Sequence, residues 1–444
     1  MTGIEIGIGS VVLIIILIYL GMYIPVALGL ISFLGVFLIR DNMDMAVALL
    51  SEAIADSITE FVFASVPLFA LMGLIVSKAG IGKDVYEVAN FLFYRIKGGL
   101  GIATVFANAV FASVTGSSIA SASVFTRVAV PEMQRFGFKP RFTVGVVAGS
   151  SVLGMLIPPS AMLIIYAIVT EQSIGQMFVA GIIPGILLSV AYAVLILLMA
   201  YVVPNWVGGV DAKDVANEDW AKLTLWDLVR KMFPIVLLIT MVLGGIYGGI
   251  VTPVEAGALG SLSALVIAVA KRRMSWPDLW EVLVETGHIT AAILFLIISA
   301  TMYNRMLGVA ALPTQFGEWL GGMEFTIGQV MTIYVILLLI LGTILDTGSI
   351  ILIVVPLFLA ALDAYNVDLV WFGIVTVVGA EIGLLTPPLG ISCFVIKSTI
   401  NDPNITLFDI FSGAFPFAVT MLLTLIVLIN YPSLSTYLLQ FGLT

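Results

Sequence analysis

The chain of 444 residues is 61% hydrophobic and 10% charged, and its mean hydropathy is +1.18. Because soluble domains are about one quarter charged, this composition excludes a soluble protein and predicts an integral membrane protein with many spans. The apolar segments are long runs rich in Ile, Leu, Val and Gly, which favours helices over an outer-membrane barrel. The net charge of −9 says nothing about orientation, which follows the positions of Lys and Arg.

The rare residue types exclude several classes of site. The single cysteine, Cys393, excludes an internal disulfide and a cysteine metal site, and the single histidine, His288, argues against a histidine metal cluster. The sequence contains no nucleophile paired with a base, and its glycine run at 244–249 lacks a Walker lysine. We therefore expect no enzyme and no ATP-driven pump, so an ion gradient must supply the energy.

Apolar runs of about 20 residues, the length of a spanning helix, recur along the chain. Three other segments, 44–59, 84–97 and 275–286, mix charged with apolar residues and indicate interfacial helices. About ten spans are predicted, at 4–22, 24–39, 61–77, 142–170, 177–203, 233–249, 253–270, 288–304, 368–398 and 410–432.

Two further apolar segments carry a polar cluster at their centres. Residues 99–131 contain TGSSIASAS at 115–123, and residues 328–362 contain GTILDTGS at 342–349. Each half of such a segment is too short to span alone, so both are predicted to be re-entrant helical hairpins with polar tips. Lys and Arg flank the first hairpin and carboxylates flank the second, so the first should open to the cytoplasm and the second to the outside.

The two halves of the chain match. The first hairpin tip, near Ser117, and Pro158 correspond to Thr347 and Pro387, with about 230 residues between the partners. Each half has an odd number of crossings, so the second lies upside down relative to the first, as in secondary transporters. The predicted organisation is a first inverted repeat (1–203), a cytoplasmic interfacial linker (204–232), a second repeat (233–432) and a C-terminal tail (433–444).

Adjacent prolines interrupt one apolar run in each half, in GMLIPPS at 154–160 and GLLTPPLG at 383–390. Two prolines forbid a regular helix, and irregular backbone at membrane depth is tolerated only where it lines a cavity or coordinates something. The freed carbonyls, together with Ser and Thr hydroxyls, are hard oxygen ligands of the kind that Na⁺ takes in broken helices.

A tip and the break that faces it are therefore predicted to form one sodium site in each half, with at least two Na⁺ ions and no transition metal. The first site would use Ser117, Ser118 and the carbonyls around Gly154 and Pro158. The second would use Gly342, Asp346, Thr347, Gly383 and Thr386. An anionic substrate would lie between the two tips, near Ser118, Ser160 and Thr386.

Charged residues inside apolar segments are further candidates. Asp346 would coordinate a cation or make a structural hydrogen bond, because an ionisable group at membrane depth is costly. Glu381 is a weaker candidate and would otherwise join two helices. Arg127 would help to hold the anion or extend to the cytoplasmic interface, and Arg305 would attract anions at the outer mouth or pair with Glu318.

Four motifs carry a resemblance to a known family. They are GSSIASASVFTRVAVPEMQRFGFKPR (116–141), GMLIPPSAMLIIYAIV (154–169), GGIYGGIVTPVEAGALG (244–260) and EIGLLTPPLGISCFVI (381–396). In this order they resemble the large membrane subunit of TRAP transporters, the tripartite ATP-independent periplasmic transporters. The resemblance extends over nearly the whole chain, from about residue 5 to residue 432.

The resemblance implies an elevator-type, sodium-coupled importer in a bacterial or archaeal inner membrane. Its partners would be a small four-helix membrane subunit and a periplasmic binding protein that delivers an organic anion, a carboxylate or a sulfonate. The family's sodium sites carry onto Ser117, Ser118, Asp346, Gly383 and Thr386, and the moving part would be 99–170 with 328–398. The alternatives are a stand-alone divalent-anion/sodium symporter and, from another class, a channel or membrane scaffold; the sequence does not identify the anion.

Overall fold

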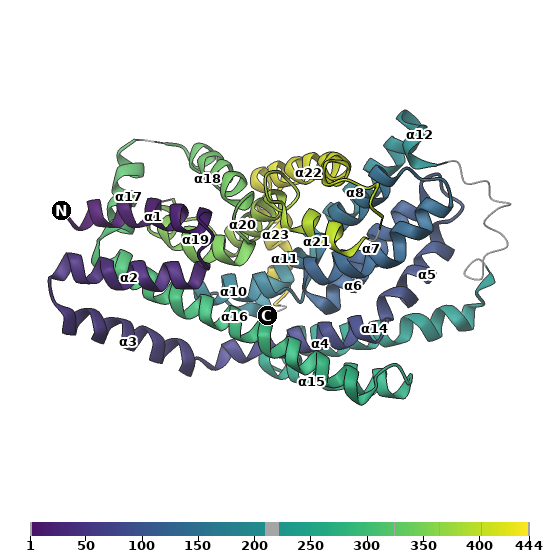
Figure 1. The fold of residues 1–444 in the computed structure, drawn as a ribbon, viewed down its shortest axis with the longest axis horizontal. Helices are drawn as coiled ribbons and strands as arrows, with labels where there is room; N and C mark the ends of the chain where they lie inside the picture. Colours follow the sequence, from purple (N-terminus) through teal and green to yellow (C-terminus); the bar gives the residue numbers. More distant parts are fainter. Residues whose placement is uncertain (1, 209–221, 324, 364, 401, 443–444) are drawn as a thin grey trace.

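A computed structural model describes residues 2–208, 222–323, 325–363, 365–400 and 402–442, and the regular elements in these ranges are helices (Figure 1). The first half contains α1 (Gly3–Tyr19), α2 (Ile24–Arg40), α3 (Met43–Thr59), η1 (Phe61–Ala64), α4 (Ser65–Lys78), α5 (Ile81–Phe93), α6 (Gly99–Thr115), α7 (Ser118–Arg135), α8 (Pro140–Ser151), α9 (Leu153–Leu156), α10 (Ala161–Val169), α11 (Ile174–Val202) and α12 (Pro204–Val207). The second half contains α14 (Leu225–Tyr247), α15 (Pro253–Ala270), α16 (Trp276–Val309), α17 (Leu312–Gly322), α18 (Ile327–Gly342), α19 (Thr347–Asp363), α20 (Leu369–Gly383), α21 (Ile391–Thr399), α22 (Leu407–Asn430), α23 (Ser433–Thr436) and η3 (Tyr437–Phe441).

Many helices begin at one sequence pattern, Ser or Thr followed three residues later by an acidic residue or Gln. At the start of α15, Glu255 N donates to Thr252 Oγ1, and Thr252 N donates to the Glu255 carboxylate at 2.8 Å. The same reciprocal pair begins α1, α14, α16, α18 and α22. Since a helix start leaves backbone donors free, this pattern fixes where these helices begin.

The predicted spans all fall on helices, but helix length supports only some of them. Within the described ranges, six helices are long and apolar enough to cross a bilayer, and α8–α9 with α10, bent by 41°, makes a seventh. The remaining three predicted spans lie on α1, α2 and the pair α20–α21. Helices α1 and α2 have 17 residues each and α20 has 15, which is short of the usual span.

One predicted boundary between helices is wrong. The interfacial helix at 275–286 and the span at 288–304 form one continuous helix of 34 residues, α16. Gly287 between them costs a helix only about 1 kcal/mol, which does not end it. Helix α14 begins at Leu225, inside the predicted linker 204–232. Residues 209–221 of that linker lie outside the described residues.

The two halves interdigitate. Helix α22 packs on α8, α21 on α7, and α10 on α19, and Figure 1 shows the yellow α21 and α22 beside the blue α7 and α8. A Cβ added at Gly145 of α8 would lie 2.2 Å from the carbonyl oxygen of Gly413 in α22. Only glycine permits so close an approach of two helix backbones in a membrane protein.

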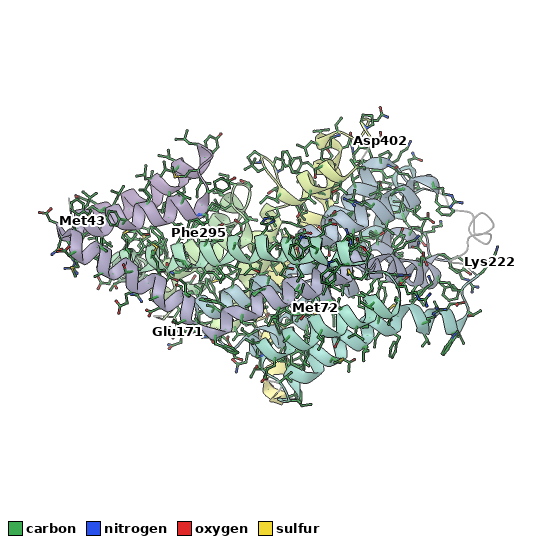
Figure 2. All side chains as sticks on the ribbon, turned by 60° about the horizontal axis from the view of Figure 1, so that its bottom comes forward. Met43, Met72, Glu171, Lys222, Phe295 and Asp402 are labelled. Carbon is green, nitrogen blue, oxygen red and sulfur yellow. The ribbon has the colours of Figure 1, made fainter. Side chains whose placement is uncertain are left out.

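Helices α3, α4 and α15 pack around the long helix α16 and its neighbours. Met72 of α4 is buried where α4 meets α15, whereas Met43 of α3 and Lys222 lie at opposite ends of the molecule (Figure 2). The Arg305 guanidinium of α16 lies 3.1 Å from the Glu52 carboxylate of α3 and also pairs with Asp56. The pairing of Arg305 with Glu318 is therefore wrong, because α3 packs along α16.

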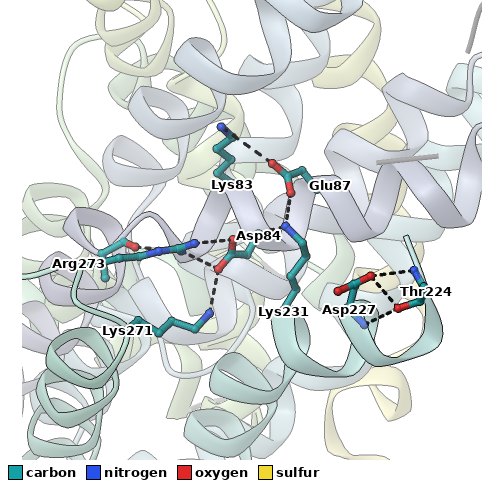
Figure 3. A network of polar contacts seen from close by, with 9 residues as sticks. Lys83, Asp84, Glu87, Thr224, Asp227, Lys231, Lys271 and Arg273 are labelled. Carbon is teal, nitrogen blue, oxygen red and sulfur yellow. Dashed lines mark hydrogen bonds and ion pairs between the residues drawn. The ribbon is translucent and has the colours of Figure 1, made fainter. Parts of the chain in front are cut away.

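A polar cluster centred on Asp84 joins the halves through α5 (Figure 3). The Asp84 carboxylate, 5% exposed, accepts from Arg273 at 2.7 Å and from Lys271 at 2.9 Å, beyond the end of α15. Lys231 of α14 lies 3.9 Å from Asp84 and also pairs with Glu87. Burial raises the pKa of Asp84, but the hydrogen bonds and charges of Arg273 and Lys271 outweigh burial and hold that pKa below its ordinary value.

Candidate functional site

The two hairpin tips are built alike. Between α6 and α7, Gly116 adopts the left-handed conformation with φ +57°, and the Ser117 hydroxyl accepts from Ala120 N at 3.3 Å. Between α18 and α19, the Asp346 carboxylate accepts from Ser349 N at 3.1 Å and also from the Ser349 hydroxyl. Each tip therefore ends in a side chain that caps the start of the returning helix.

The two predicted helix breaks are present. Helices α8–α9 and α10 are interrupted at 157–160, and α20 and α21 at 384–390, with cis peptide bonds at Pro158–Pro159 and Pro387–Pro388. The Ser160 hydroxyl accepts from Leu163 N at 3.4 Å and donates to Met155 O. The Thr386 hydroxyl donates to Gly383 O at 3.0 Å. Both hydroxyls thus lie against freed helix ends.

In each half the tip touches the break. A Cβ at Gly154 would lie 2.9 Å from the carbonyl carbon and oxygen of Ser117, and a Cβ at Gly383 would lie 2.3 Å from the carbonyl carbon of Gly342. In the second half, Leu389 N also donates to Thr343 O at 3.3 Å. The structure therefore brings together both groups of residues that the sequence analysis assigned to cation sites.

The halves also meet at this place. A Cβ at Gly348 of the second tip would lie 3.6 Å from Met162 Sδ of α10, and α20 packs against both α9 and α10. On the other side, α7 of the first hairpin packs against α21. The tips and breaks of both halves therefore share one region of the protein.

Helix ends of both polarities converge at the tips and breaks. Helices α6, α9, α18 and α20 end there, and α7, α10, α19 and α21 begin there. Carbonyls and partial negative charge at the C-terminal ends favour a cation, whereas free amides and partial positive charge at the N-terminal ends favour an anion. The same region can therefore hold both kinds of ion.

The donor atoms in this region are hard oxygens. Ser118 is 1% exposed, and its hydroxyl oxygen has no hydrogen-bond partner among the described residues. With the break carbonyls and the Asp346 carboxylate, such hydroxyls fit Na⁺ rather than a soft metal. In the described ranges, no group of three or more His, Cys, Asp or Glu residues could hold a metal ion.

The two breaks differ in exposure. Pro158, Pro159 and Ser160 are buried, whereas Pro387, Pro388 and Leu389 are exposed and Thr386 is partly exposed. The first break is therefore enclosed by the rest of this chain, whereas this chain leaves part of the second break uncovered.

Arg127, which was predicted as a substrate-binding residue, does not lie near the hairpin tips. Arg127 is exposed and lies nine residues along α7 from Ser118, roughly 14 Å at the rise of an α-helix. This position fits an arginine that extends to the interface.

Two buried contacts were not assigned to the site by the sequence analysis. Asn108 Nδ2 of α6 donates to the Ser150 hydroxyl of α8 at 2.6 Å, and Thr347 Oγ1 donates to Glu381 Oε1 at 2.6 Å. Glu381 was expected only as a weaker candidate or a link between helices. The sequence feature that could have identified Glu381 as a site residue is a carboxylate placed about one turn before the break at 384–390.

Comparison with known proteins identifies the family. Residues 11–434 match the family described as "Tripartite ATP-independent periplasmic transporter, DctM component". The C4-dicarboxylate TRAP transporter large permease protein DctM of Pseudomonas aeruginosa is 31% identical, with 92% of each chain covered. The sialic acid TRAP transporter large permease protein SiaM of Vibrio cholerae is 28% identical over 95% of this chain and 96% of its own.

A solved structure shares the fold. Neisseria gonorrhoeae MtrF, described in the context of antimetabolite efflux pumps, superposes with a TM-score of 0.59 at 11% identity over 89% of this chain and 85% of MtrF. At that identity the likeness concerns the fold alone. The family match and the relatives together show that this chain is a multi-pass membrane transport protein, not an enzyme, and belongs to the DctM family, the large permease components of TRAP transporters.

Proposed function

We propose that this chain is the transport subunit of a sodium-coupled importer of a small organic anion in a bacterial or archaeal inner membrane. The observation that carries the proposal is the repeated contact of a polar hairpin tip with a proline break, Ser117 on Gly154 and Gly342 on Gly383. Each contact gathers carbonyls and hydroxyls where helix C-terminal ends meet, a combination that suits Na⁺.

The substrate is bound between the two tips. Helices α7, α10, α19 and α21 begin there, so their free amides and the hydroxyls of Ser118, Ser160 and Thr386 can hold an anion without a buried lysine or arginine. Two relatives are named for C4-dicarboxylate and for sialic acid, which both carry carboxylates. These names support a carboxylate as the substrate. The proposal also covers a sulfonate, another organic acid anion.

Transport follows an elevator mechanism. The part that moves comprises 99–170 and 328–398, and the remaining helices form the scaffold together with a small four-helix partner subunit. The chain makes ten crossings and two re-entrant hairpins in two inverted repeats. Two or more Na⁺ ions, bound as co-transported cargo, order the tips, and a periplasmic binding protein delivers the anion.

The test is uptake by proteoliposomes that contain this chain and its small subunit, supplied with the cognate binding protein and labelled carboxylate. An inward Na⁺ gradient should drive accumulation, and replacement of Na⁺ by choline should reduce it to the level of empty vesicles. Undiminished uptake in choline would contradict the proposal. Sodium-dependent uptake without the binding protein would instead favour the stand-alone symporter.

A further inference from the structure

Glu381 is a buried carboxyl group that makes one side-chain hydrogen bond among the described residues. It lies on α20, two residues before the Gly383 that touches Gly342, and it is 0% exposed. Its Oε1 accepts from Thr347 Oγ1 at 2.6 Å, and its Oε2 has no hydrogen-bond partner among the described residues. A carboxyl group that only joined two helices would be expected to use both oxygens, because an unpaired buried polar atom is costly.

The contact determines how the Thr347 hydroxyl is oriented. A hydroxyl has one proton to donate and two lone pairs to offer. Because the hydroxyl proton of Thr347 points at Glu381, both lone pairs of that hydroxyl are directed elsewhere. Thr347 is the first residue of α19 and follows Asp346 directly. A hydroxyl can coordinate a cation only through its lone pairs, and a carboxylate acceptor makes the oxygen a stronger donor to a cation.

We propose that Glu381 is a positioning residue for the cation site of the second half. It holds the Thr347 hydroxyl with its lone pairs toward the tip, and through this bond it couples the tip of the second hairpin to the break in α20. Glu381 itself does not contact the ion. This inference rests on the proposed sodium coupling and deepens it.

Among the residues that the structure describes, the first half has no counterpart of the hydrogen bond between Thr347 and Glu381. Ser118 is the first residue of α7, as Thr347 is of α19, and the Ser118 hydroxyl has no hydrogen-bond partner among the described residues. The residue equivalent to Glu381 is Val152. The proposal therefore predicts that removal of the Glu381 carboxyl group weakens Na⁺ binding at the second cation site and leaves the first cation site unchanged.

The experiment measures Na⁺-dependent thermal stabilisation of the purified complex with its small subunit, with choline at equal ionic strength as the reference. The variants are Glu381→Leu, Glu381→Gln, Thr347→Val and the double variant Glu381→Leu/Thr347→Val. Thr332→Val is the matched control, since Thr332 lies in the same hairpin, is exposed, and donates only to Gly328 O. Na⁺ half-saturation of uptake is a second readout.

Removal of the acceptor or of the hydroxyl should each raise the Na⁺ concentration for half-maximal stabilisation about 10-fold. The double variant should be no worse than either single variant, because both act through one hydroxyl. Glu381→Gln, which keeps an acceptor oxygen, should stay close to the parent, as should Thr332→Val. Additive effects in the double variant, or a Gln variant as impaired as the Leu variant, would overturn the inference.

Measurements on the parent protein distinguish a failure of sodium coupling from a failure of the role of Glu381. If the parent shows neither Na⁺-specific stabilisation nor Na⁺-driven uptake, the proposed sodium coupling fails. If the parent shows both and Glu381→Leu leaves the half-saturation unchanged, sodium coupling stands and the role of Glu381 fails.

Discussion

Ser117 and Asp346 hold the same position in the two halves of the chain, each as the cap of the helix that leaves a hairpin tip. The difference between them is one of charge, since a serine caps without charge and an aspartate adds a carboxylate. Because asparagine caps a helix about as well as aspartate, the capping role of Asp346 can be separated from the role of its charge.

Asp346→Asn should therefore fold normally and lose Na⁺-driven uptake. Asp346→Ala should lose uptake and also stability, by about 1 kcal/mol, because the cap is removed. Proteoliposome uptake and thermal melting of the purified complex measure the two effects. Asp368→Asn is the control, since Asp368 caps α20 through Val370 N and Trp371 N and should retain uptake. Full uptake by Asp346→Asn would show that the carboxylate acts only as a cap.

Gly383→Ala tests the contact of tip and break. The added methyl group would lie 2.3 Å from the carbonyl carbon of Gly342, so the second hairpin must move away from the break. We expect at least a 10-fold loss of uptake, equal to about 1.4 kcal/mol at the transition state, and a lower melting temperature. Gly287→Ala in α16, where nothing lies within 4 Å of the added carbon, should keep full uptake. Equal activity of both variants would contradict a tight tip–break contact.

The sequence was sufficient for the features that have a local signature. Two prolines in an apolar run predict a break, and both breaks occur at the predicted residues. A small polar cluster between two short apolar halves predicts two helices joined by a turn, and α6–α7 and α18–α19 occupy those segments. These signals are local because they arise from missing backbone donors and from helix capping.

Contacts between distant residues were not predictable in the same way. The partners of Arg305 lie on α3, and Thr347 of α19 contacts Glu381 of α20. Both contacts depend on how the helices pack, which the spacing of residues in the sequence does not show. The continuity of α16 was missed for a related reason: polar residues near Gly287 suggested a boundary, whereas packing against α2, α3 and α4 holds the helix together.

Arg127→Gln should leave the substrate concentration for half-maximal uptake unchanged. Arg127 is exposed and roughly 14 Å along α7 from Ser118, which is too far for its guanidinium to hold an anion between the tips. Ser160→Ala is the comparison, because Ser160 is buried at the first break, and it should weaken substrate binding. A large rise in half-saturation for Arg127→Gln alone would restore Arg127 as a substrate ligand.

Asp84→Asn should destabilise the protein without altering its dependence on Na⁺. Removing the buried carboxylate leaves Lys271 and Arg273 facing each other, and because both are partly exposed we expect a loss of about 1–3 kcal/mol. Lys83→Gln is the control: Lys83 is 67% exposed and lies 3.9 Å from Glu87, so its loss should not change the melting temperature.

The pH dependence of the difference in melting temperature between the parent and Asp84→Asn tests whether the Asp84 carboxylate causes it. The pKa of Asp84 in the folded protein lies below its ordinary value of 3.8, so the folded state releases this proton more readily than the unfolded chain does. The stabilisation is therefore complete above the unfolded pKa and is lost as the pH falls through the folded pKa. The melting temperatures of parent and Asp84→Asn should differ by a constant amount from pH 7 to about pH 5 and converge only below about pH 4. Convergence near neutral pH would mean that another group is responsible.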